Sequence, residues 1–71
     1  MEMPISMGQI GNAYTIRRIS GSGEVRSHLQ AMGFNPGTEI RLIAQLHGDV
    51  IVGVRESRVA VNEEQARHIL V

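Results

Sequence analysis

The chain has 71 residues, which is enough for one small domain spanning residues 1–71. Seven arginines balance seven acidic residues and there is no lysine, so the chain lacks the basic excess that nucleic-acid-binding proteins usually carry. The absence of cysteine excludes disulfides, thiolate metal ligands and cysteine nucleophiles.

The hydropathy pattern predicts a soluble, cytoplasmic protein that is not embedded in a membrane. The longest unbroken apolar runs are three residues, whereas a bilayer-spanning helix needs about 20. The first residues do not show the basic-then-apolar layout of a signal peptide.

The N-terminal part is expected to begin with a disordered tail over residues 1–5. Pro4 to Ser6 then opens a short turn, which Ser6 and Gln9 are expected to cap. Ala13 to Ile19 is predicted to be one strand. Ile16 and Ile19 stand three residues apart, so a regular strand would place them on opposite faces. A bulge between them would bring both to one face, and we therefore predict one.

A helix is predicted over Glu24 to Met32. Its apolar residues have helical spacing and share one face: Val25, Leu29 and Met32. Gly33 supplies the left-handed residue that ends the helix, and Phe34 is placed to pack back on Leu29 in a Schellman-type cap.

Two hairpins follow. A three-residue loop, His47 to Asp49, would pair Leu46 with Val50 and Leu42 with Val54. A second loop at Glu56 and Ser57 would pair Val54 with Val59 and place Arg55 opposite Arg58.

The C-terminal segment reads as a short helical turn followed by an edge strand. Asn62 and Gln65 have the spacing of a capping box. Residues 69–71 form the expected edge strand.

Together the elements predict a mostly β fold of about five short strands. One helix lies between the first and second strands, and a short helical turn lies near the C-terminus. So few strands close into a small barrel more readily than they form two packed sheets.

The helix-to-strand junction resembles that of the FeoA family. The matching residues are Leu29, Met32, Gly33, Pro36, Gly37, Thr38 and Ile40. The flanks agree in order and spacing: Pro4 to Ser6 with Gly11, Ile16 with Ile19, Gly48 with Asp49, and Val59 to Val61 followed by Ala66, Ile69 and Val71.

The resemblance implies an SH3-like barrel that serves as a non-enzymatic accessory module of bacterial ferrous-iron uptake. Its implied partner is the cytoplasmic part of a FeoB-type GTP-binding permease. The chain departs from the family at Gly8, where a large aliphatic residue is usual and where Met7 or Ile10 is expected to fill the space. It departs again at His28, where the family often has arginine.

The partner-binding candidates are Leu29, Met32 and Phe34 at the helix junction. An unpaired strand edge is a second candidate surface, for a partner or for homo-oligomer formation. Each of the seven arginines is also a candidate to act in trans on the nucleotide of a GTPase, and the sequence does not choose among them.

His47 and Asp49 are the candidate metal ligands, because their nitrogen and oxygen donors suit ferrous iron. The pairs Glu24 with His28 and Glu64 with His68 have helical i, i+4 spacing, which is also that of ordinary surface pairs. Direct metal sensing is therefore an alternative function, and it needs a third ligand. Another alternative is a regulatory domain like those of iron-dependent repressors, here without the DNA-binding half.

The sequence shows no nucleophile with an adjacent base and no phosphate-binding loop, so no catalytic role is predicted.

Overall fold

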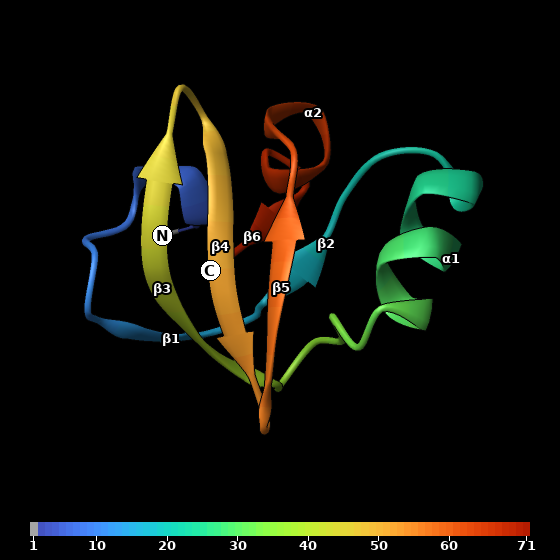
Figure 1. Cartoon of the computed structure of the whole chain (residues 1–71). Helices are drawn as coiled ribbons and strands as arrows, with labels where there is room; N and C mark the ends of the chain where they lie inside the picture. The colour runs from blue at the N-terminus through green and yellow to red at the C-terminus, as the bar shows by residue number, and fades with distance from the viewer. Residues whose placement is uncertain (1) are drawn as a thin grey trace.

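A computed structural model describes residues 2–71. Its elements, in chain order, are the 3-10 turn η1 (Ile5–Met7), β1 (Ala13–Thr15), β2 (Arg18–Ile19), α1 (Gly23–Ala31), β3 (Glu39–Leu46), β4 (Asp49–Val54), β5 (Ser57–Val61), α2 (Glu63–Ala66) and β6 (Ile69–Leu70) (Figure 1). The predicted mostly β class, the helix after the early strands and the short C-terminal helix are confirmed.

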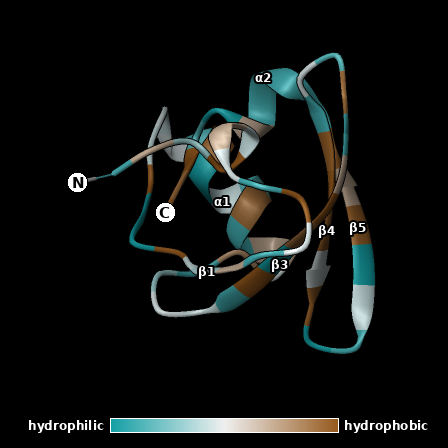
Figure 2. Cartoon of the chain, turned by 90° about the vertical axis from the view of Figure 1, so that its left-hand side faces the viewer, coloured by the Kyte–Doolittle hydropathy of each residue, from teal (hydrophilic) through white to brown (hydrophobic). Residues whose placement is uncertain are grey.

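The strands form two antiparallel sheets that enclose one core. The larger sheet has the order β1-β3-β4-β5, and β2 pairs with β6 in the smaller one, which lies behind it in Figure 1. The core comprises fourteen buried residues: Ile5, Ile16, Ile19, Leu29, Phe34, Ile40, Leu42, Val50, Val52, Val54, Val61, Ala66, Ile69 and Val71. Figure 2 shows the hydrophobic stretches on the strands and the more polar ones in the connecting turns.

The single strand predicted over residues 13–19 is wrong. The chain leaves the larger sheet at Ile16, whose N–H donates to the carbonyl of Thr38 at 2.9 Å. The next residue, Arg17, already donates to Leu70 in the smaller sheet at 2.8 Å. A bend between two sheets, rather than a bulge within one, turns both isoleucines inward.

The predicted register of the first hairpin is also wrong. The loop has two residues, His47 and Gly48, with φ of 53° and 90°, as two-residue hairpin turns favour. Leu46 therefore lies opposite Asp49, and a bulge between Leu42 and Ala44 returns Leu42 to the core opposite Val52. Ala44 and Leu46 were expected to lie on the same face as the valines of β4. They point outward instead.

The second hairpin differs from its prediction by two residues. Arg55, with φ of 56°, and Glu56 form the loop, so Val52 pairs with Val59 and Arg58 lies opposite Gly53. Because side chains alternate with a period of two, the shift keeps the valines on the inner face. It also separates the two arginines that were expected to face each other.

Helix α1 forms as expected and has a complete Schellman cap. The Ser22 side chain accepts a hydrogen bond from the Val25 N–H at its N-terminus. At the other end Phe34 N–H donates to the Leu29 carbonyl at 3.0 Å, and Gly33 N–H donates to Gln30 at 3.0 Å. Gly33 has φ of +102°, as the predicted left-handed stop requires.

Replacing Gly33 by valine is expected to cost about 2–3 kcal/mol, because a β-branched residue resists positive φ. A Cβ at this position would lie 3.6 Å from Val54, an ordinary contact, so backbone strain rather than crowding sets the cost. The melting temperature should fall by about 10–20 °C. Gly23→Ala is the matched control, since Gly23 has an ordinary φ and open space, and it should leave stability unchanged or raised. An unchanged melting temperature for Gly33→Val would refute the strain argument.

The N-terminal tail is not disordered over the described residues, so that prediction is wrong; Met1 lies outside them. Met3 exchanges two backbone hydrogen bonds with Val71, of 2.9 and 2.8 Å, and Ile5 is fully buried. The carboxylate of Glu2 lies 2.9 Å from the Arg18 guanidinium. Both ends of the chain therefore lie side by side (Figure 2), and β6 has neighbours on both edges.

The space beside Gly8 is filled by Tyr14, not by Met7 or Ile10 as expected. A Cβ on Gly8 would lie only 2.9 Å from the Tyr14 ring, whereas Met7 is 70% exposed and Ile10 60%. The Tyr14 hydroxyl accepts a hydrogen bond of 2.8 Å from the Gln9 N–H. The predicted Ser6 and Gln9 capping pair is wrong, because Pro4 is the N-cap of η1 and makes no side-chain cap bond.

Candidate functional site

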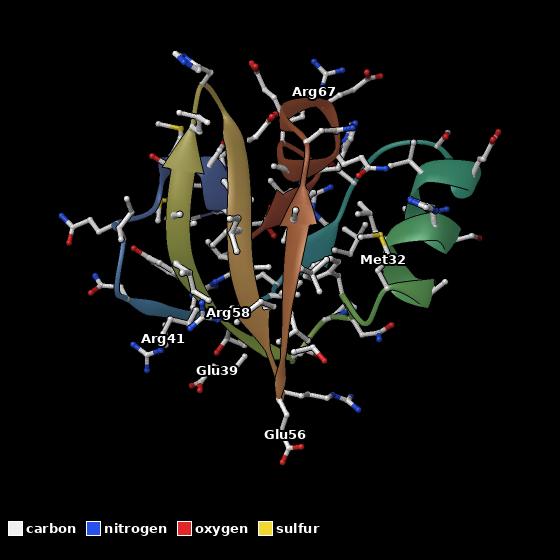
Figure 3. All side chains as sticks on the ribbon, in the orientation of Figure 1. Met32, Glu39, Arg41, Glu56, Arg58 and Arg67 are labelled. Atoms are coloured by element: carbon white, nitrogen blue, oxygen red, sulfur yellow. The ribbon has the colours of Figure 1, made fainter. Side chains whose placement is uncertain are left out.

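The C-terminal end of α1 holds the three partner-binding candidates. Leu29 and Phe34 are fully buried, so they fix the junction and present no surface to a partner. Met32 is half-buried and packs against the core. It points from the end of the helix toward the sheet in Figure 3. Of the three candidates, only Met32 can be touched by another molecule.

Helix α1 attaches to the barrel along a narrow stripe and leaves most of its surface free. Its inward residues are Val25 and Leu29, continued by Met32 at the C-cap, whereas its other residues are exposed. Figure 1 shows the helix standing to one side of β5. The helix and its capped junction therefore present an exposed surface with a methionine at one end.

The two helical Glu–His pairs border crevices between α1 and α2. One crevice, of about 230 Å³, is lined by Glu64 and His68, and the other, of about 360 Å³, by Glu24 and His28. Val25 and Gln65 line both, which places the two pairs in adjoining crevices. The His68 ring is already engaged, because its Nδ1 lies 2.9 Å from the Ser20 hydroxyl.

The proposed metal ligands His47 and Asp49 lie on the turn between β3 and β4. His47 is exposed, but the Asp49 carboxylate accepts a hydrogen bond of 2.8 Å from the Glu63 N–H and so caps α2. The Glu63 side chain lies over Gly48, where a Cβ would be only 2.6 Å from its carboxyl carbon. Within residues 2–71, no group of three or more His, Cys, Asp or Glu side chains is placed to hold a metal ion. The hydrogen bond gives Asp49 a structural role, because it links the β3–β4 hairpin to the N-terminus of α2.

Within residues 2–71, the side chains of Arg18 and Arg41 donate hydrogen bonds to other parts of the fold. Arg18 donates to Glu2, and this hydrogen bond holds the pKa of the Glu2 carboxyl below its ordinary value. Arg41 donates to the carbonyl of Gly11. The exposed arginines lie on several elements: Arg26 on α1, Arg67 after α2, and Arg41 and Arg58 on the two strands beside Gly53.

An apolar surface lies on the outside of the larger sheet, and it includes Leu46, which the sequence assigned to the core face. Leu46 is 68% exposed and Ile51 40%. A groove of about 450 Å³ runs between them and Ala60. Sequence reasoning missed it because the bulge between Leu42 and Ala44, which turns this part of β3 outward, leaves no local signal. No helix in the described part of the chain is long and apolar enough to cross a membrane.

Comparison with known proteins agrees with the observed fold. The chain is 28% identical to the iron uptake regulatory protein FeoA, whose crystal structure superposes with a TM-score of 0.87 over 100% of this chain and 95% of that one. It is 25% identical over 68 residues to a Methanocaldococcus jannaschii protein assigned as Fe(2+) transport protein A, which covers 96% of this chain and 83% of the relative. A manganese-dependent transcriptional repressor shares the fold, with a TM-score of 0.89 at 19% identity, over 99% of this chain and 40% of the repressor.

The FeoA domain family matches residues 3–71, which is almost the whole sequence. The helix junction, the β3–β4 turn and the closing strand all lie inside this range. The chain therefore belongs to the FeoA domain family, a family of non-catalytic accessory domains.

Proposed function

We propose that the protein is a cytoplasmic accessory module of ferrous-iron uptake that binds the GTP-binding cytoplasmic part of a FeoB-type permease. The family match over residues 3–71 carries the proposal. The names of two relatives, an Fe(2+) transport protein A and an iron uptake regulatory protein, support the same process.

The rigid end of α1 is the docking surface in this proposal. Its Schellman cap and the buried Leu29 and Phe34 hold the backbone in one conformation. Met32 adds a flexible, polarizable side chain that adapts to a partner. A preorganised junction with one adaptable anchor binds without the entropy cost of ordering a loop.

Titration of the ¹⁵N-labelled protein with the soluble cytoplasmic domain of the cognate permease tests this proposal. Amide shifts are expected from Val25 to Phe34. Met32→Glu should weaken binding at least tenfold, because a carboxylate in an apolar contact must be desolvated. Met7→Glu is the matched control: Met7 is 70% exposed and belongs to η1, whose dark-blue ribbon lies on the far side of the β3-β4-β5 sheet's strands from α1 in Figure 1, so binding should not change.

The outcome that overturns the proposal is equally specific. If the permease domain causes no amide shifts, the proposed partner is wrong. If the shifts leave α1 untouched and persist in Met32→Glu, the proposed docking surface is wrong. The melting temperature of Met32→Glu must be measured alongside, because Met32 also packs on the core.

Direct metal sensing, the alternative function, is tested by a titration with ferrous iron alone. Iron binding at the β3–β4 turn would broaden the amide signals of His47 and Asp49, and their double substitution by alanine would abolish the effect. A repressor-like role would instead require a DNA-bound partner. The structural match to the manganese-dependent repressor concerns the fold alone.

A further inference from the structure

The outer face of the β3-β4-β5 sheet carries an apolar surface that the α1 docking proposal does not use. Ala44, Ile51 and Ala60 lie in one row across the three strands, because Ile51 pairs with both alanines. Leu46 continues the surface toward the β3–β4 turn, and Ile43 continues it the other way, with its Cδ1 3.3 Å from where a Gly53 Cβ would be. We call these five residues the outer sheet patch.

Charged residues border this patch with opposite sign at its two ends. Arg41 and Arg58 lie opposite Gly53, one on each neighbouring strand. Figure 3 shows both arginines at the end of the sheet that carries the β4–β5 turn. At the other end Asp49 lies opposite Leu46, and its hydrogen bond to α2 brings Glu63 beside it. The glutamates nearest the arginines, at positions 39 and 56, lie farther from the central row.

The arrangement is self-complementary. Ile51 lies midway along β4 between Asp49 and Gly53. A two-fold rotation about the central row therefore places Asp49 of one copy over Gly53 of the other, between its two arginines. The same rotation brings Arg58 toward Glu63 of the second copy. Two-fold symmetric pairs of this kind are the commonest soluble oligomers.

We propose that the outer sheet patch binds a second copy of this chain, forming a two-fold symmetric dimer with the two sheets stacked face to face. Small side chains at Ala44 and Ala60 flank Ile51 and allow the sheets to approach to about 10 Å, the usual separation of stacked sheets. The patch is small, so the dimer is weak and forms at micromolar or higher concentration. The end of α1 stays free in this dimer, so it is compatible with the docking surface proposed above.

Sedimentation equilibrium of the full chain, from about 20 µM to 1 mM, tests the dimer, since this range covers weak interfaces. A monomer–dimer equilibrium is expected, weakened by high salt because charges border the patch. Ile51→Glu should raise the dissociation constant at least tenfold, since it buries a carboxylate at the two-fold axis. Ile51 is already partly exposed on the outer face, so the variant should still fold, which an amide spectrum checks.

A charge exchange distinguishes this dimer from nonspecific association. Arg58→Glu alone and Glu63→Arg alone should each dimerise at least tenfold less well, because like charges then face each other. Mixing the two variants should restore dimers, since each then supplies the charge that the other lacks. Arg26→Glu, on exposed α1, makes the same charge change away from the patch and should have no effect.

Several outcomes would overturn the proposal. These are a protein that stays monomeric at every concentration, a dimer that Ile51→Glu leaves intact, or a mixture of charge variants that fails to recover. A monomer whose outer-face amides shift with the permease domain would assign the patch to that partner instead. Because the α1 docking proposal is tested on different residues, the two can fail independently.

Discussion

Replacing Phe34 by alanine is expected to lower the free energy of unfolding by about 3–5 kcal/mol, the usual cost of truncating a fully buried aromatic residue. The ring is among the largest side chains of the core and has no exposed surface. Its own N–H closes the Schellman cap on Leu29, so the cavity would open beneath the end of α1. A domain of 71 residues has a stability of about 4–11 kcal/mol. The variant should therefore lose a large part of its free energy of unfolding, which chemical denaturation would measure.

Phe34→Leu is the matched variant, since leucine keeps apolar volume at the site and should cost less than alanine. It should also preserve the backbone bonds of the cap, which no side chain makes. An alanine variant within about 0.5 kcal/mol of the parent, the range of ordinary surface changes, would mean that the junction is not part of the folding core.

Ile5→Ala is expected to cost about 2–5 kcal/mol, as for other buried aliphatic residues. The residue lies in the segment that sequence reasoning assigned to a disordered tail, yet its side chain has no exposed surface. The hydrogen bonds between Met3 and Val71 hold the segment against the end of the chain. Loss of this contact should therefore loosen both termini together.

Met7→Ala is the control for Ile5→Ala. Met7 follows two residues later in the same turn, but its side chain is largely exposed, so the change should be within about 0.5 kcal/mol. Amide hydrogen exchange at Val71 should accelerate in Ile5→Ala and stay unchanged in Met7→Ala. Equal free energies of unfolding for Ile5→Ala and Met7→Ala would contradict the packing of Ile5 in the core and support a disordered tail.

The two proposed surfaces lie on different elements of the barrel. The end of α1 is rigid and presents one methionine, which suits a partner met transiently. The outer sheet patch is flat and has opposite charges at its ends, which suits a second copy. An oligomer of this kind would present two α1 surfaces at once, so its affinity for an oligomeric partner would exceed that of one copy.

The sequence alone determined α1, its Gly33 stop and the family. It also predicted the N-cap of α2, where the Asn62 side chain accepts a hydrogen bond of 2.8 Å from the Gln65 N–H. Helix caps depend on residues within about five positions of each other, so the residue types and spacing suffice to predict them. The FeoA resemblance likewise rests on spacing along one chain, and the match over residues 3–71 confirms it.

Only the tertiary structure decided the hairpin registers, the division of the first strand, the order of the N-terminus and the packing of Tyr14 on Gly8. These features depend on contacts between residues far apart in the sequence. A one-residue bulge moves every following side chain to the other face of its strand. The bulge after Leu42 thereby turned Leu46 out of the core and created the surface proposed here for self-association.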